Sequence, residues 1–148
     1  MIKLKFAYSY YCSIHILVLR NDEILLMKRK NTGYEDDKWS VVSGKLDGNE
    51  TVIDAAIREA KEEVGITVSP SDVRVIGVTQ RKEMTEWIDF YVTLNTWEGE
   101  VTNVEEDKCE QLAWFNQEEL PEGMIEHVRQ ALEQNRDSMW FRTYGTFK

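Results

Sequence analysis

Several residue types that mark whole classes of protein are scarce in this chain. Among its 148 residues it has 2 Cys, 2 Pro and 8 Gly, which excludes a disulfide framework, a collagen-like repeat and a proline-rich linker. It has no apolar run long enough to span a bilayer, because Ser9, Ser13 and His15 interrupt the apolar stretch at residues 6–19. We therefore expect a single cytoplasmic domain over residues 1–148, with no membrane partner and with a buried strand in that stretch.

Basic residues are also outnumbered. The chain has 18 Lys and Arg against 27 Asp and Glu, a net charge of −9. Duplex nucleic acid is excluded as a nonspecific partner, because such binding needs Lys and Arg to neutralise phosphates. The acidity is uneven, since residues 1–48 hold 8 basic and 6 acidic residues (+2) and residues 49–148 hold 10 and 21 (−11). A protein of this charge either avoids anionic ligands or recruits them through a metal ion.

Apolar periodicity predicts strands and helices in a mixed order. Alternating or β-branched runs predict strands at residues 13–20, 23–30, 39–42, 73–79, 87–96 and 112–115. Apolar residues at helical spacing predict helices at 51–64 and 124–134. The first helix has a capping box at Thr51 and Asp54 and a stop at Gly65. Because strands and helices do not alternate strictly, we expect an α/β fold with a mixed sheet between helices.

Three glutamates crowd one side of the first predicted helix. Glu59, Glu62 and Glu63 lie at i, i+3 and i+4 spacing, so they share a narrow sector of the helix surface. Their like charges repel at a cost of about 0.2–0.5 kcal/mol for each pair. A hard divalent cation relieves this repulsion by taking carboxylate oxygens as ligands. The alternative is an acidic helix face that is simply solvated.

The window around these glutamates resembles a family signature. It runs Gly44, five residues, Glu50, seven residues, then Arg58-Glu59-Ala60-Lys61-Glu62-Glu63-Val64-Gly65-Ile66. This is similar to Gly-x5-Glu-x7-Arg-Glu-apolar-x-Glu-Glu-x-Gly-apolar, the box of the Nudix hydrolases, with every specified position filled. The resemblance, to MutT-like members of the family, implies an α/β/α sandwich with a mixed sheet between helices. It also implies a single Nudix domain with its box at residues 44–66.

The resemblance assigns roles to residues of the box. It implies that Glu62 and Glu63 bind the metal ion, Mg²⁺ or alternatively Mn²⁺, and that Glu59 is either a third ligand or the general base. A backbone carbonyl just before the box glycine, here that of Ser43, is a further implied ligand. Many members carry Pro-Gly-Gly where this chain has Val42-Ser43-Gly44. A carbonyl is retained whatever the side chain, although a serine backbone is less permissive than glycine.

Other charged residues receive two interpretations each. Arg58 either orients a glutamate by a charge-assisted hydrogen bond or forms an ordinary surface ion pair. Glu50 either caps the helix or joins the metal network. Family members often draw a further acidic ligand or general base from a distant loop, and here Glu105 is the first choice and Glu106 the second. The alternative for Glu105 is a solvated loop charge.

The expected substrate contacts lie on strands. Arg29 ends the second predicted strand within the basic triplet at residues 28–30, where it either contacts phosphate or is an exposed strand end. Trp87 and Tyr91 alternate with the apolar residues of their strand. They either stack on a base or pack under a neighbouring helix.

The implied reaction is Mg²⁺-dependent hydrolysis of the pyrophosphate linkage in a nucleoside diphosphate joined to another moiety. A nucleoside triphosphate is favoured as the substrate, because the short chain has little beyond the core fold to recognise a second nucleoside or sugar. The alternatives are an ADP-sugar or dinucleoside polyphosphate pyrophosphatase, and a non-catalytic module that senses a nucleotide. The expected partner is therefore a small nucleotide, and the oligomeric state stays open.

Overall fold

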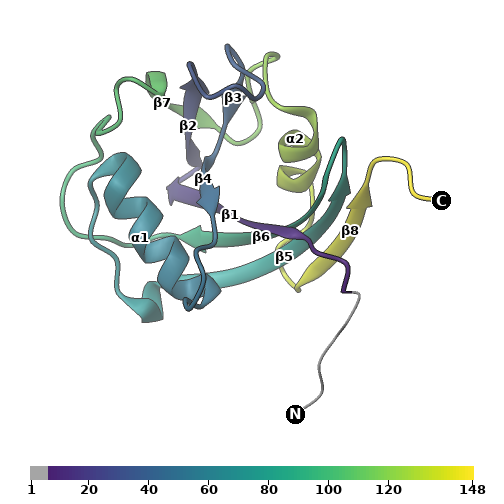
Figure 1. The fold of residues 1–148 in the computed structure, drawn as a ribbon. Helices are drawn as coiled ribbons and strands as arrows, with labels where there is room; N and C mark the ends of the chain where they lie inside the picture. The colour runs from purple at the N-terminus through teal and green to yellow at the C-terminus, as the bar shows by residue number, and fades with distance from the viewer. Residues whose placement is uncertain (1–6) are drawn as a thin grey trace.

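The structure, a computed structural model, describes residues 7–148 (Figure 1). Phe6, at the start of the apolar stretch, lies outside the described residues, and the expected buried strand begins at Tyr11. Within this part of the chain, no helix has the length and apolar character needed to cross a lipid bilayer. In chain order the elements are β1 (Tyr11–Arg20), β2 (Glu23–Arg29), β3 (Trp39–Ser40), β4 (Val42–Lys45), α1 (Val52–Val64), the 3₁₀ turn η1 (Pro70–Asp72), β5 (Val73–Lys82), β6 (Glu86–Leu94), β7 (Cys109–Asn116), α2 (Glu126–Leu132) and β8 (Trp140–Tyr144).

The strands form one mixed sheet. Their order is β3-β2-β1-β6-β5-β8, with β4 paired to β1 and β7 paired to β2. β1 runs parallel to β6 and β5 runs parallel to β8, whereas the other pairs are antiparallel. Along one edge of β1 the neighbour changes, since residues 13–16 pair with β4 and residues 19–20 pair with β2, whereas residues 11–18 pair with β6 along the other edge. The expected mixed sheet is confirmed, and β1 lies at its centre.

Each face of the sheet carries one helix. Successive side chains of a strand point to opposite faces, and in β1 this alternation divides the core in two. Ile14, Ile16 and Val18 belong to a cluster that includes the buried residues of α1. Leu17 belongs to a second cluster that includes Val128 of α2. The two helices therefore lie apart with the sheet between them (Figure 1), which confirms the expected α/β/α sandwich.

Local signals set both ends of α1. The Thr51 hydroxyl accepts a hydrogen bond from the Asp54 N–H, and the Asp54 carboxylate accepts one from the Thr51 N–H, as the capping box predicts. Gly65 ends the helix at φ 75°, in the left-handed region that favours glycine. The buried side of α1 is rich in alanine, at Ala55, Ala56 and elsewhere, so the helix can lie close to the sheet. Both predicted ends of this helix are confirmed.

Two expected elements differ because of their partners. The single strand expected at residues 39–42 is two strands, since β3 pairs with β2 whereas β4 pairs with β1. The helix expected at residues 124–134 begins only at Glu126, because Met124 forms a β-bridge with Trp39. An apolar run does not specify which strand it will pair with, so these two boundaries depend on the tertiary fold.

Strand β8 was not expected from the sequence. It is a five-residue edge strand, and every second residue of it is exposed. Trp140 holds it in place by packing against Gly77 of β5, where a Cβ atom would overlap the indole ring. The glycine that makes this contact possible lies far from β8 in the sequence, so no local pattern marks the strand.

The capping box leads to a prediction about stability. Replacing Thr51 with alanine removes the hydroxyl that accepts the Asp54 N–H, so we expect Thr51→Ala to lose about 1 kcal/mol of unfolding free energy. Urea unfolding followed by circular dichroism measures this loss. Thr51→Ser keeps the hydroxyl and is the matched control. Equal stability of the alanine and serine variants would show that the box contributes nothing.

Candidate functional site

A cavity of about 700 Å³ lies where α1, β1, β4 and the β5–β6 hairpin come together. Its walls hold two different groups of side chains. The carboxylate group, formed by Glu63 and Glu105, lies beside Ser43 and Gly44. The polar ring group consists of His15, Tyr34, Arg81, Glu83, Trp87 and His127. The volume is in the range of small-molecule sites.

Glu59 lies behind the carboxylate group, on the side of α1 that faces the sheet. Glu59 is only 8% exposed, which is unusual for a glutamate. Gly44 makes this position possible, because a Cβ atom at Gly44 would overlap the Glu59 carboxylate. The first glycine of the box is therefore required for space rather than for an unusual backbone angle.

Arg58 binds three glutamates at once. It donates to Glu59 Oε1 at 2.7 Å and to Glu62 Oε2 at 3.2 Å. It also donates two hydrogen bonds to the Glu50 carboxylate, from Nε at 3.0 Å and from Nη2 at 2.7 Å. This bidentate pairing fixes the guanidinium, and these contacts are those that the orienting interpretation of Arg58 requires.

Glu50 does not cap the helix. The helix is capped by Thr51 and Asp54, and the Glu50 carboxylate is bound instead by Arg58 and by the Asp47 N–H. The Arg58 guanidinium lowers the pKa of the Glu50 carboxyl below its ordinary value. Glu50 therefore supports the carboxylate group indirectly, by holding Arg58.

Glu63 of the carboxylate group is buried among other acidic side chains. Its Oε2 atom is buried and has no hydrogen-bond partner in the described chain. Burial, together with the charges of Glu59 and Glu105, raises the pKa of Glu63 well above its ordinary value, and the Ser43 N–H offsets only part of this. Burial also raises the pKa of Glu59. An unpaired carboxylate oxygen among acidic neighbours fits a divalent cation, because a cation relieves both the burial and the repulsion.

The predicted ligands are only partly gathered. Glu59 and Glu63 interact with each other, but the Glu62 side chain is 51% exposed and turned to Arg58. Among residues 7–148 no three His, Cys, Asp or Glu side chains are already arranged around a common point where a metal ion would fit. Ser43 lines the cavity, and its backbone N–H bonds to the Glu63 carboxylate; the role of its carbonyl as a further ligand stays a prediction.

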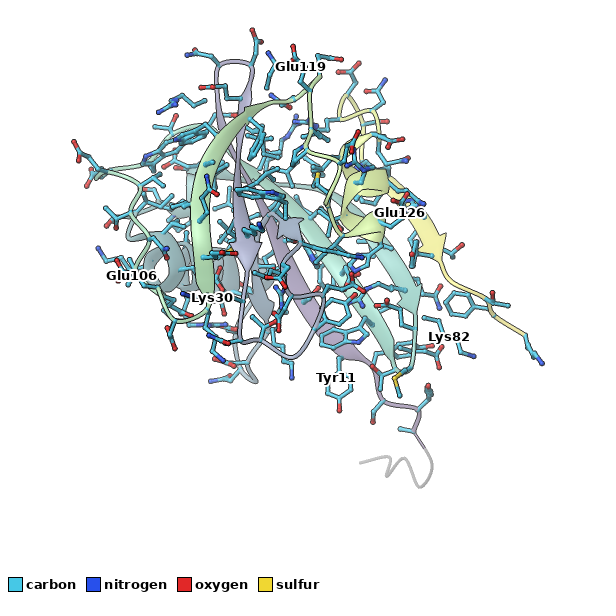
Figure 2. All side chains as sticks on the ribbon, turned by 90° about the horizontal axis from the view of Figure 1, so that it is seen from above. Tyr11, Lys30, Lys82, Glu106, Glu119 and Glu126 are labelled. Atoms are coloured by element: carbon cyan, nitrogen blue, oxygen red, sulfur yellow. The ribbon has the colours of Figure 1, made fainter. Side chains whose placement is uncertain are left out.

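The structure distinguishes the two loop glutamates. Glu105 lines the cavity and is close enough to Glu63 to raise its pKa. The backbone holds this loop beside α1, because the Val104 N–H donates to the Glu63 carbonyl at 3.2 Å. Glu106 is exposed and lies at the outer edge of the molecule (Figure 2). Of the two loop carboxylates, Glu105 is thus the one that lines the cavity.

Of the three predicted substrate contacts, Arg29 and Trp87 line the cavity and Tyr91 does not. Arg29 lines the cavity, and its guanidinium donates to the Tyr34 carbonyl at 2.9 Å and to Thr32 Oγ1 at 3.0 Å. Trp87 also lines the cavity, and its ring stacks on Tyr11 with centroids 4.9 Å apart.

Stacking of a base on Tyr91 is contradicted by the structure. Its ring is 0% exposed and lies against His15 at 4.6 Å. Strand β6 is covered on both faces, so the residues that alternate with its apolar set are buried as well. The packing interpretation of Tyr91 is the correct one.

The polar ring group rests on a buried ion pair that sequence reasoning missed. Arg81 of β5 donates to both oxygens of Asp89 in β6, at 2.7 and 3.0 Å. Ser13 donates to the same carboxylate at 2.7 Å and lies 3.1 Å from His15 Nδ1. In the sequence, the only sign of this ion pair is the presence of polar residues inside strands that are otherwise apolar.

A second chain of contacts joins the loop after β2 to helix α2. The Tyr34 hydroxyl donates to Glu83 at 2.7 Å and lies 2.9 Å from His127 Nε2. Glu83 also binds Arg81, which links this chain to the buried ion pair. Burial lowers the pKa of His15 to about 4 and that of His127 to about 3, so both imidazoles are neutral at pH 7.

Comparison with known proteins adds a family match. Residues 12–134 match the model of the NUDIX domain. An RNA pyrophosphohydrolase of Halorhodospira halophila is 35% identical over 65 residues, which is 44% of this chain and 34% of the relative. The human 8-oxo-dGDP phosphatase NUDT18 is 27% identical over 122 residues, which is 79% of this chain and 35% of the relative. The chain spans about a third of the length of these two curated relatives.

A solved structure is similar over nearly its whole length. The MutT NUDIX hydrolase from Burkholderia pseudomallei superposes with a TM-score of 0.79 at 30% sequence identity. The match covers 86% of this chain and 98% of that protein.

The close approach of Gly44 to Glu59 can be tested by substitution. Gly44→Ala must displace the Glu59 carboxylate, so we expect Mg²⁺ affinity to fall about tenfold or more. Isothermal titration calorimetry measures this affinity. Gly48→Ala is the control, because a Cβ atom there meets nothing within 4 Å. If both alanine variants bind Mg²⁺ as the unaltered protein does, Glu59 has no part in cation binding.

The raised pKa of Glu63 predicts a pH-dependent stability. In the metal-free protein the folded state keeps a proton on Glu63 at pH values where the unfolded chain has released it, so stability falls as pH rises above about 4.5. We expect metal-free Glu63→Gln to be more stable than the unaltered protein at pH 7, by about 1 kcal/mol or more. The difference should vanish near pH 4.

Urea unfolding at several pH values measures this effect. Glu106→Gln removes an exposed charge from the same region and serves as the control. A constant difference between Glu63→Gln and the unaltered protein at all pH values would contradict the assignment.

Proposed function

Because the chain belongs to the NUDIX domain family, we propose that it hydrolyses the pyrophosphate linkage of a nucleoside diphosphate joined to another group. The observation that carries this proposal is the buried Oε2 atom of Glu63, which has no hydrogen-bond partner in the described chain. Glu63 lines the cavity together with Glu105 and interacts with Glu59. Such an arrangement is unfavourable unless a cation completes it. A pyrophosphate is the kind of anion that a divalent cation escorts into an acidic site.

We assign the metal site to Glu59, Glu63 and the Ser43 carbonyl. Glu62 joins them when its carboxylate leaves Arg58, to which it is bound at 3.2 Å on the exposed side of α1. Mg²⁺ is the expected ion, and Mn²⁺ is the alternative with the same preference for oxygen ligands. When bound, it neutralises phosphate oxygens and stabilises the charge of the leaving phosphate.

The protein's own residues divide the remaining work. Arg58 keeps Glu59 in place through the 2.7 Å hydrogen bond. Lys45 lines the cavity, where its ammonium group lies over the rings of Tyr11 and Trp87, and we assign it to a phosphate contact. Arg29, which also lines the cavity, is assigned as a second phosphate contact. Glu105 is the general base that takes the proton of the attacking water, because Glu59 is buried against Gly44 and tied to Arg58.

A nucleoside triphosphate is the favoured substrate. Relatives are named as an RNA pyrophosphohydrolase and an 8-oxo-dGDP phosphatase, so the substrates to be tested include RNA with a 5′-triphosphate and oxidised guanine nucleotides. ADP-ribose and a dinucleoside polyphosphate complete the panel.

Product release from this panel with Mg²⁺ tests the proposal. We expect at least one substrate to yield a mononucleotide, and we expect Glu63→Gln to lower kcat/KM by about a hundredfold, because it removes a charged ligand. Glu106→Gln should leave the rate unchanged. Failure to release product from any substrate, or full activity of Glu63→Gln, would overturn the enzymatic assignment.

A further inference from the structure

The loop between β2 and β3, residues 30–38, is tied to two different walls of the cavity. Its beginning is bound to the loop that carries Glu105, because the Asn31 amide donates to the Asp107 carbonyl at 3.1 Å. Its middle is bound by Tyr34 to α2 and to the β5–β6 hairpin (Figure 1). In the described part of the chain, no other side chain of this loop hydrogen-bonds to either of those two elements. The connection to them therefore depends on one tyrosine.

The hydroxyl group of Tyr34 is attached to the most buried polar contacts of the protein. It donates to Glu83 Oε1 at 2.7 Å and lies 2.9 Å from His127 Nε2. Glu83 also binds Arg81, which donates to both oxygens of Asp89 at 2.7 and 3.0 Å. Asp89 is 0% exposed and belongs to the central part of the sheet. The tyrosine side chain is thus held by a rigid element rather than by another loop.

The backbone of Tyr34 in turn holds Arg29. The Tyr34 carbonyl accepts from Arg29 Nε at 2.9 Å, and Arg29 Nη2 donates to Thr32 Oγ1 at 3.0 Å. These two bonds occupy one edge of the guanidinium. Within the described residues Arg29 forms no ion pair, so its other N–H groups are available to an anion. The residues on either side of Tyr34, Gly33 at φ 82° and Glu35 at φ 49°, are both left-handed, a backbone shape that a glutamate adopts only when its surroundings hold it.

We propose that Tyr34 is a positioning residue for phosphate binding, which acts by holding Arg29 in place. This inference rests on the proposed function, which assigns a phosphate contact to Arg29. The hydroxyl of Tyr34 fixes the loop to the hairpin and α2, and its carbonyl fixes the guanidinium. An arginine that is held in advance loses less conformational freedom when a phosphate binds, so the affinity is higher. The buried pair of Arg81 and Asp89, which has no other part in the proposed reaction, is the anchor of this connection.

Removal of the hydroxyl group tests this role. Tyr34→Phe keeps the ring and the carbonyl, and we expect its affinity for methylenediphosphonate with Mg²⁺ to fall about three- to tenfold, as the loss of one or two hydrogen bonds predicts. This pyrophosphate analogue has a carbon bridge that cannot be hydrolysed, and calorimetry measures its binding. With a substrate that is hydrolysed, KM should rise by a similar factor while kcat changes little. Tyr144→Phe is the matched control, because its ring also lies beside His127, at 5.5 Å.

A second substitution shows whether Tyr34 acts through Arg29. In an Arg29→Met background there is no guanidinium to position, so Tyr34→Phe should weaken diphosphonate binding no further. An equal loss in both backgrounds would show that the tyrosine supports the cavity by another route, and the inference fails. Far-UV circular dichroism and urea unfolding establish that each variant is folded.

The two measurements also separate this inference from the proposed reaction. Weaker diphosphonate binding by Tyr34→Phe, in a protein that hydrolyses no substrate of the panel, supports the inference and overturns the reaction. Hydrolysis with an unchanged KM and unchanged diphosphonate binding in Tyr34→Phe overturns the inference alone. If the unaltered protein does not bind the diphosphonate, Arg29 has no phosphate to contact and the inference fails as well.

Discussion

The bonds of Arg58 to three glutamates are the interaction on which the site depends. Without that guanidinium, Glu59 would be an unpaired charge at 8% exposure, in the layer between α1 and the sheet. Glu50 anchors the guanidinium from outside the helix, and the absent side chain of Gly44 leaves room for the Glu59 carboxylate. The spacing of the box therefore has a physical basis: one glycine, one anchor and one arginine let acidic residues gather beside a cavity.

Strand β1 connects this carboxylate group to the polar ring group. Its residues Ile14 and Ile16 face the core beneath α1, whereas Ser13 and His15 lie on the other side and reach the cavity. His15 is also directly opposite Ser43 of β4 in the strand register. One central strand thus places the carboxylate group and the polar ring group next to each other, because alternate side chains and neighbouring strands share a rigid frame.

The carboxylate group destabilises the folded chain when no metal ion is bound. Glu63 has a raised pKa and an orphaned oxygen, and Glu59 is buried with only part of its charge compensated. Residues that destabilise the empty fold and become favourable when a ligand binds are typical of functional sites. Nδ1 of His127 is likewise buried without a hydrogen-bond partner among the described residues.

The sequence by itself determined the box, α1 with both of its ends, and the roles open to Glu59, Glu63, Arg58 and Glu105. These features follow from helical spacing and capping, which act within a few residues. Tertiary structure alone decided that Tyr91 is buried, that Glu50 binds Arg58, that β3 and β4 separate, and that β8 completes the sheet. It also decided that His15 meets His127. Strand pairing and side-chain packing join residues far apart in the chain, and no local pattern records which distant residues will become neighbours.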